Sequence, residues 1–202
     1  MKPTTPASFY SILESKFPHT PTATQSVALQ KLAEFTLSTV KDEVFLLKGY
    51  AGTGKTTLIG TLVNSLWKVQ KKAVLMAPTG RAAKVMSNYS SMQAFTIHRK
   101  IYFPKKQSGG GVQFVLAPNK HRDTLFIVDE ASMIPDGKQN QQLFDGSSLL
   151  DDLISYVYSG VDCKLIFIGD TAQLPPVKLD VSPALEKDTL AECLEDYFHQ
   201  SE

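Results

Sequence analysis

The sequence predicts an α/β fold, in which a parallel β-sheet covered by helices carries a small inserted β-hairpin. Short apolar runs that alternate with segments of helical periodicity predict the sheet, because parallel strands are joined by crossover helices. A glycine-rich loop directly after the first run supports the same fold. Two β-rich runs flank a Lys-Lys-Gln-Ser-Gly-Gly-Gly turn at residues 105–111, and they predict the hairpin at about residues 101–119.

Residues 1–21 predict an N-terminal extension with a short helix, and the α/β domain is expected over residues 22–202. Apolar runs predict four buried strands, at Val44–Leu47, Ala73–Ala77, Thr124–Val128 and Lys164–Ile168. Apolar stripes at helical spacing predict helices within residues 22–37, 57–63, 81–86 and 149–157, and a further one beginning at Ser182-Pro183.

Composition indicates a soluble, cytoplasmic protein that does not contact a membrane. Of 202 residues, 43% are hydrophobic and 20% are charged, as in ordinary globular domains. The N-terminus lacks the apolar core of a signal peptide, and no apolar run approaches a membrane span. Cys163 and Cys193 lack metal-ligand spacing, so we expect free thiols in a reducing compartment.

The net charge of +1 hides a strong separation of charge along the chain. No Asp or Glu occurs from Val44 to Arg122, while all twenty acidic residues lie outside that segment. The acid-free segment holds thirteen basic residues, Lys48, Lys55, Lys68, Lys71, Lys72, Arg81, Lys84, Arg99, Lys100, Lys105, Lys106, Lys120 and Arg122. A nucleotide needs only one or two of these cations, so the segment predicts contact with a longer polyanion.

The loop Gly49-Tyr50-Ala51-Gly52-Thr53-Gly54-Lys55-Thr56 has the pattern of a phosphate-binding loop between a strand and a helix. Its glycines allow backbone N–H groups to approach phosphate oxygens, and the helix N-terminus adds partial positive charge. Lys55 is expected to reach the β- and γ-phosphates of ATP, and Thr56 to ligate Mg²⁺. The predicted nucleotide-binding residues are Gln25, Gly49, Ala51, Gly52, Thr53, Gly54, Lys55, Thr56 and Thr57. A plain glycine turn is the weaker alternative.

Two further segments predict the chemistry of the same site. Asp129 and Glu130 end a predicted strand, where Asp129 suits a magnesium ligand and Glu130 a general base that polarises water. Gln173 lies in Gly169-Asp170-Thr171-Ala172-Gln173-Leu174-Pro175-Pro176-Val177, and its amide suits contact with a γ-phosphate and the attacking water. A surface acidic pair and a proline turn are the alternatives. Gln25 either completes a capping box with Thr22 or reads the adenine edge, and the sequence leaves both open.

In this order, the segments resemble the motifs of the superfamily 1 helicases, specifically the RecD-like branch. The matching motifs are Thr24-Gln25, Gly49–Thr56 (motif I), Ala77–Lys84 (Ia), Thr96–His98 (Ib), Asp129–Met133 (II) and Gly169–Val177 (III). The resemblance implies a RecA-like motor domain that binds single-stranded DNA through motifs Ia and Ib, with 5′-to-3′ movement. It also places the hairpin where such helicases carry a strand-separating pin; a surface excursion is the alternative.

The resemblance and the charge distribution together give a set of candidate DNA contacts. These are Pro78, Thr79, Arg81, Lys84, Thr96, His98, Arg99, Lys100, Tyr102, Phe103, Lys105 and Lys106. The cations and His98 suit phosphates, and Tyr102 and Phe103 offer stacking faces, although core packing explains either aromatic equally well.

Helicases of this branch also need a second RecA-like domain, which supplies an arginine to the ATP site. Only 25 residues follow Val177, and no Arg occurs beyond Arg122. We therefore expect an N-terminal motor domain whose partners are single-stranded DNA or a DNA fork and the missing C-terminal domain of the same protein. The chain alone is expected to hydrolyse ATP very slowly, because such an arginine is worth about 10³–10⁵ in rate.

Two other classes of protein fit parts of the sequence. A small-molecule phosphotransferase would use the same phosphate-binding loop, but it leaves the acid-free segment and Gln173-Leu174-Pro175-Pro176 unexplained. A nucleotide-dependent interaction module would use the polar segment Gly137–Ser148 to recruit a protein partner.

Overall fold

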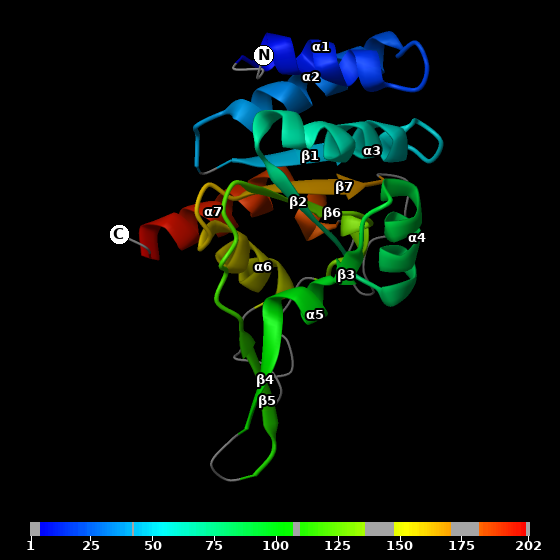
Figure 1. Ribbon diagram of the computed structural model, residues 1–202. Helices are drawn as coiled ribbons and strands as arrows, with labels where there is room; N and C mark the ends of the chain where they lie inside the picture. The colour runs from blue at the N-terminus through cyan, green and yellow to red at the C-terminus, as the bar shows by residue number, and fades with distance from the viewer. Residues whose placement is uncertain (1–4, 42, 107–109, 136–147, 171–181, 201–202) are drawn as a thin grey trace.

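A computed structural model describes residues 5–41, 43–106, 110–135, 148–170 and 182–200. Its centre is a five-stranded parallel sheet in the order β1-β7-β6-β2-β3 (Figure 1). The strands are β1 (Val44–Lys48), β7 (Lys164–Gly169), β6 (Thr124–Val128), β2 (Lys72–Ala77) and β3 (Ala94–Thr96). The predicted α/β class with a parallel sheet is therefore confirmed. The edge strand β3 was not predicted, because three residues are too few to show a periodic pattern.

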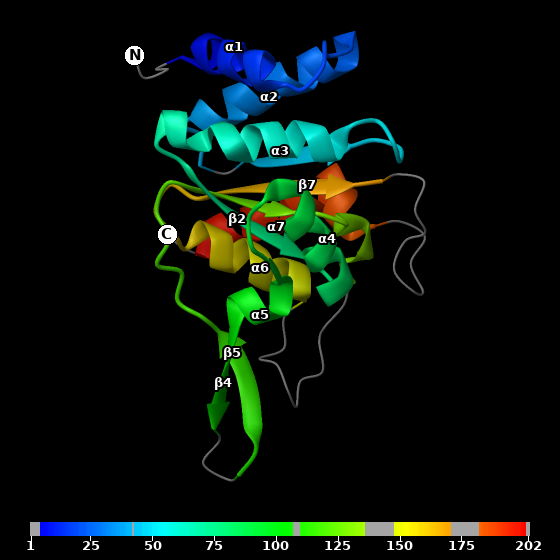
Figure 2. The ribbon, with the colours of Figure 1, turned by 45° about the vertical axis from the view of Figure 1, so that its right-hand side comes forward.

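Helices cover both faces of the sheet, in two layers that Figures 1 and 2 show above and below it. One layer holds α1 (Pro6–Lys16), α2 (Ala23–Leu37) and α3 (Lys55–Ser65), which continues as η1 (Leu66–Val69); α4 (Gly80–Ser90) lies beside them at the β2–β3 edge. The other layer holds α5 (Ile97–Ile101), α6 (Leu149–Tyr158), η3 (Pro183–Leu185) and α7 (Lys187–Gln200). The short helix η2 (Ala131–Met133) follows β6.

Each face of the sheet has its own core because successive side chains of a strand point to opposite faces. In β6, Leu125 and Ile127 pack with the α1–α3 layer, while Phe126 and Val128 pack with the α6 layer. Phe9 and Leu13 of α1 are fully buried in the first of these cores. Residues 6–17 therefore share the core of the domain.

The predicted hairpin consists of β4 (Tyr102–Lys106) and β5 (Val112–Leu116), which pair antiparallel and project away from the sheet (Figure 1). Phe114 and Leu116 pack against the core of the α6 layer, and this contact anchors the base of the hairpin. The helix expected to begin at Ser182-Pro183 begins later: Pro183 opens the single turn η3, and α7 starts at Lys187. Within the described ranges, no helix has the length and apolarity that crossing a membrane requires.

Candidate nucleotide and magnesium site

The phosphate-binding loop connects the end of β1 to the start of α3, and its geometry depends on two glycines. Gly52 and Gly54 have φ of +77° and +89°, a region in which side chains other than glycine are strained. The Gly49 N–H donates to the Gly169 carbonyl at 3.3 Å, which ties the loop to the end of β7. The Lys55 ammonium donates to the carbonyl oxygens of Gly49 and Tyr50, at 2.5 and 2.9 Å. Lys55 therefore curls back over the loop.

The N-terminus of α3 differs from those of five other helices. The N-cap residue of α3 is Gly54, and no side chain accepts a hydrogen bond from its first turn. Side-chain hydroxyls cap five other helices, at Thr5, Thr22, Thr79, Thr96 and Ser148. The first N–H groups of a helix have no partner within the helix, so α3 presents donors suited to an anion.

A cavity of about 540 Å³ at the carboxyl-terminal rim of the sheet brings together six of the nine predicted nucleotide-binding residues with Asp129 and Glu130, whereas Gln25, Gly49 and Thr53 do not line it. The loop contributes Ala51, Gly52 and Gly54, and the start of α3 contributes Lys55, Thr56 and Thr57. Asp129 and Glu130, which follow β6, line the same cavity, as do Gly169 and Asp170 at the end of β7. Parallel strands place their carboxyl ends on one rim, and this explains why segments far apart along the chain meet here.

Asp129 is held by hydrogen bonds to both of its carboxylate oxygens. Its Oδ1 accepts from the Glu130 backbone N–H at 2.9 Å, and its Oδ2 accepts from the Tyr89 hydroxyl at 2.8 Å. Burial raises the pKa of Tyr89 well above its ordinary value, and the negative charges of Asp129 and Glu130 raise it further. Tyr89 therefore remains a phenol and a hydrogen-bond donor. No sequence motif identified Tyr89 as a residue of this site.

Glu130 adopts φ of +54°, in the left-handed region that residues other than glycine rarely occupy. Such backbone strain is concentrated at functional sites, where the surrounding structure maintains it. The adjacent residues Ala131 and Ser132 are buried in η2, which fixes the turn that presents Glu130 to the cavity.

The oxygen ligands at this rim fit a magnesium ion. Thr56 offers a hydroxyl and Asp129 a carboxylate, and both line the one cavity. Mg²⁺ prefers oxygen ligands and keeps several waters, so it is commonly bound through one or two protein groups together with phosphates. Among the described residues, no group of three His, Cys, Asp or Glu is placed to bind a metal. Thr56 and Asp129 therefore offer two oxygen ligands of the kind that Mg²⁺ uses together with phosphates.

Gln25 takes part in both a helix cap and the loop. Its side-chain oxygen accepts from the Thr22 N–H at 3.0 Å, which completes the predicted capping box with Thr22. Its amide nitrogen donates to the Thr53 carbonyl of the phosphate-binding loop at 3.1 Å. Gln25 is therefore positioned beside the loop, and its role toward adenine stays a prediction. Gln173 lies outside the described residues.

The candidate DNA contacts lie along α4, α5 and the hairpin, which follow one another in both views (Figures 1 and 2). Arg81, Lys84, His98, Arg99, Phe103, Lys105 and Lys106 are exposed, whereas Pro78, Thr79, Thr96 and Lys100 are partly buried. Burial lowers the pKa of Lys100, whose ammonium lies 5.3 Å from the centre of the Phe95 ring.

Tyr102 does not offer the stacking face that the sequence suggested. It is only 8% exposed, packs in the core of the α6 layer and donates its hydroxyl to Asp152. The alternative of core packing is therefore the one that the structure supports, because Tyr102 is the first residue of the hairpin and anchors it to α6. Phe103, which points to the other face of β4, is 42% exposed.

The fold divides the acid-free segment between opposite ends of the sheet. Five of its cations, Lys68, Lys71, Lys72, Lys120 and Arg122, precede or begin β2 and β6 and so lie at the amino-terminal rim, away from the cavity. Lys71 pairs there with Asp123 at 3.2 Å, and the Lys68 ammonium lies 4.0 Å from the Trp67 ring centre. None of these five cations is among the predicted DNA contacts.

The parallel sheet, the glycine loop and the shared cavity define a P-loop NTPase with a RecA-like core. The chain belongs to the AAA domain family, whose model matches residues 32–179. An uncharacterized protein of Methanocaldococcus jannaschii is 33% identical over 161 residues, which are 74% of this chain and 13% of that protein.

Two further relatives are named as a DNA helicase and as an enzyme subunit. The ATP-dependent RecD2 DNA helicase of Deinococcus radiodurans is 32% identical over 133 residues, or 65% of this chain and 16% of the helicase. The RecD subunit of the RecBCD enzyme of Buchnera aphidicola is 30% identical over 171 residues, or 74% of this chain and 25% of the subunit. The chain thus spans a quarter or less of the length of these three relatives. The resemblance to the N-terminal domain of RecD-like superfamily 1 helicases is confirmed.

Proposed function

We propose that this chain is the ATP-binding motor domain of a cytoplasmic DNA helicase that couples hydrolysis to 5′-to-3′ movement along single-stranded DNA and to unwinding of a fork. The observation that carries the proposal is the cavity shared by Lys55, Thr56, Asp129 and Glu130. Two relatives of this chain are named as an ATP-dependent DNA helicase and as a subunit of the RecBCD enzyme. These names favour a motor over a small-molecule phosphotransferase.

The proposal gives a role to the polar groups of the loop, of the start of α3 and of the segment that follows β6. Lys55 exchanges its bonds to loop carbonyls for the β- and γ-phosphates, while Gly52, Gly54 and the uncapped start of α3 supply backbone donors. Thr56 and Asp129 would hold Mg²⁺, which neutralises charge on the phosphates. Glu130 orients and deprotonates the attacking water, and Gln173 senses the γ-phosphate.

DNA would lie across the exposed cations of α4, α5 and the hairpin. Arg81, Lys84, Arg99, Lys105 and Lys106 are exposed there, and Phe103 offers a partly exposed ring for stacking. If about five phosphates are contacted, the logarithm of affinity should fall with the logarithm of salt concentration at a slope near −3.5. A second RecA-like domain of the same protein would complete the ATP site with an arginine, so this chain alone should bind ATP and hydrolyse it slowly.

The test is the binding of a fluorescent ATP analogue to the 202-residue chain in magnesium, with Lys55→Ala as the variant. Loss of one charge-assisted contact of about 2 kcal/mol predicts roughly 30-fold weaker binding. Lys48→Ala is the matched control, because Lys48 is an exposed lysine at the end of β1 that does not line the cavity. Equal affinity of the Lys55→Ala and Lys48→Ala variants would contradict the assignment of the site.

A further inference from the structure

Tyr89 reaches from the last turn of α4 to the carboxylate that follows β6. Its hydroxyl donates to Asp129 Oδ2 at 2.8 Å, while the other oxygen of Asp129 accepts from the Glu130 N–H. These two donors approach the carboxylate from different elements, and together they fix its orientation. Tyr89 is thus the only described side chain for which a hydrogen bond to Asp129 is found.

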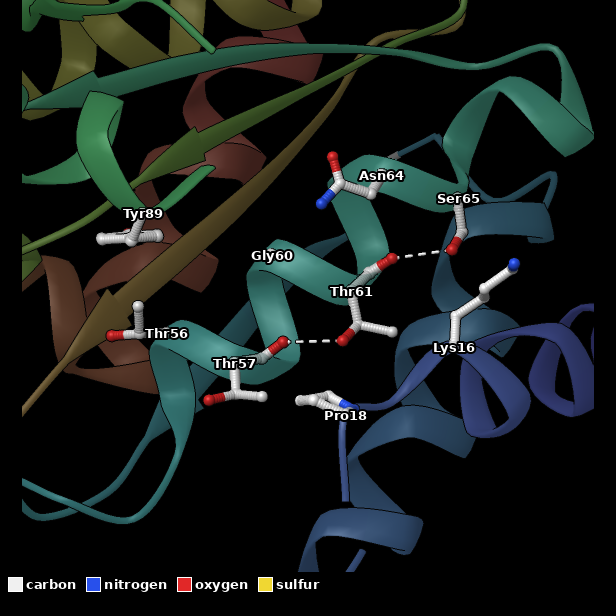
Figure 3. A pocket seen from close by; sticks show the side chains of 9 residues that line it. All are labelled: Lys16, Pro18, Thr56, Thr57, Gly60, Thr61, Asn64, Ser65 and Tyr89. Atoms are coloured by element: carbon white, nitrogen blue, oxygen red, sulfur yellow. Dashed lines mark hydrogen bonds between the residues drawn. The ribbon is translucent and has the colours of Figure 1, made fainter. Parts of the chain in front are cut away.

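Tyr89 also stands where two cavities meet. It lines the nucleotide cavity, and it lines a second cavity of about 520 Å³ that runs along α3 past Gly60 and Asn64 toward Lys16 (Figure 3). Thr56 is likewise common to both, and Figure 3 shows Tyr89 facing Thr56 at the start of α3. The Tyr89 side chain is therefore placed beside both candidate magnesium ligands.

The helix that carries Tyr89 also carries candidate DNA contacts. Arg81 and Lys84 are exposed at the first turns of α4, and Tyr89 lies two turns further along the same helix. Ala83, Met86 and Ser90 are buried, so one face of α4 is packed on the domain along its length. The exposed cations and Tyr89 are therefore carried by one helix that is packed on the domain.

We propose that Tyr89 is a positioning residue, which orients Asp129 toward magnesium and couples occupancy of the cationic side of α4 to the nucleotide site. The inference rests on the proposed function, because it takes Asp129 as the magnesium ligand and α4 as a DNA contact. By linkage, DNA on α4 must change the affinity for magnesium nucleotide by the same factor as the nucleotide changes the affinity for DNA.

The test uses Tyr89→Phe, which removes one hydroxyl and keeps the ring. Nucleotide affinity is measured by fluorescence with magnesium and with EDTA, each with and without single-stranded DNA. Loss of an outer-shell partner of a metal ligand commonly reduces metal affinity by about 10-fold or more. We expect the gain in nucleotide affinity caused by magnesium to fall about 10-fold in the variant, with affinity in EDTA unchanged. The coupling factor between DNA and nucleotide should fall toward one.

Tyr10→Phe is the matched control, because the Tyr10 hydroxyl also donates to a carboxylate, that of Glu14, at 2.7 Å on the exposed side of α1. Tyr10→Phe should leave the magnesium gain in nucleotide affinity and the coupling factor between DNA and nucleotide unchanged. Adding Tyr89→Phe to Asp129→Asn should have no further effect on the magnesium gain, because Tyr89 acts through Asp129. A merely structural role would instead lower affinity in EDTA as well.

The outcomes separate this inference from the proposed function. If Tyr89→Phe has the same magnesium gain and the same coupling factor as the unaltered chain, the role of Tyr89 is overturned and the proposed function is not affected. An unaltered chain that binds nucleotide without any magnesium gain overturns the assignment of Asp129, and the inference with it. An additive effect of Tyr89→Phe on Asp129→Asn also overturns the inference.

Discussion

Substitution of Gly54 by alanine tests the geometry of the phosphate-binding loop most directly. Gly54 has φ of +89°, and a Cβ atom built on it would lie 2.6 Å from the amide nitrogen of Gln25. Gly54→Ala therefore carries two separate penalties: a strained backbone and a clash with a side chain. Two other glycines provide graded controls. Gly52 has φ of +77° and no atom within 4 Å of its added Cβ, and Gly80, the first residue of α4, has neither a positive φ nor a close atom.

The magnitudes follow from these environments. A left-handed conformation costs an alanine about 1–2 kcal/mol, so Gly52→Ala should lower the free energy of unfolding by that amount. Gly54→Ala adds the displacement of Gln25, whose hydrogen bond to the Thr53 carbonyl is worth about 1 kcal/mol, for a total of about 2–3 kcal/mol. Gly80→Ala should be neutral or stabilise the protein by up to about 1 kcal/mol, because alanine favours the helix and restricts the unfolded chain.

Urea denaturation of the three variants measures these differences. The two contributions separate in the Gln25→Ala background, where the clash is absent and Gly54→Ala should cost only about as much as Gly52→Ala. Nucleotide affinity should fall in Gly54→Ala and stay unchanged in Gly80→Ala. If Gly54→Ala is no more destabilising than Gly80→Ala, or if the Gln25→Ala background gives no relief, the loop does not have the described geometry.

Three further predictions concern catalysis, stability and DNA. Glu130→Gln should keep magnesium-nucleotide affinity within about 3-fold while single-turnover hydrolysis falls about 10²-fold or more, and retained hydrolysis would exclude Glu130 as the general base. Glu43→Gln should destabilise the protein by about 2 kcal/mol in urea denaturation, because it neutralises the partner of the buried Lys164 ammonium, whereas Asp123→Asn at the exposed pair with Lys71 should change stability by less than about 1 kcal/mol. Arg81→Ala should reduce the steepness of the salt dependence of DNA affinity by about 0.7, and Arg122→Ala at the opposite rim should not; equal effects would argue against a DNA path over α4.

The parts of the fold that could be predicted depend on local pattern and on one rule of topology. The four longer strands are continuous apolar runs, since both faces of the sheet pack against a hydrophobic core, and the loop from Gly49 to Thr56 has a specific spacing. Placing Asp129 beside that loop required only that parallel strands share a carboxyl-terminal rim. The three-residue strand β3 and the five-residue helix α5 carry too few residues for a periodic signal.

The remaining features depend on tertiary contacts. Tyr102 and Phe103 are equivalent aromatics in the sequence, but the pleat of β4 turns one toward Asp152 of α6 and leaves the other exposed. Likewise, the division of the cations between two rims follows from strand direction, which places Lys72 and Arg122 at the strands' amino-terminal ends. Tyr89 lies forty residues from Asp129 in the sequence, and no pattern joins them until α4 packs beside β2.

The segregation of charge along the chain explains why a tyrosine suits the position beside Asp129. Lys55, a cation that lines the cavity, comes from the acid-free residues 44–122. The described carboxylates of the cavity, Asp129, Glu130 and Asp170, all come from the later, acidic part of the chain. A lysine or arginine from α4 in the place of Tyr89 would hold Asp129 by charge and would compete with Mg²⁺ for it. A phenol instead donates one hydrogen bond and leaves the negative charge of the carboxylate intact. Tyr89 can therefore orient Asp129 without weakening its attraction for the magnesium ion that we propose it to hold, which is the property that the proposed coupling between α4 and the nucleotide site requires.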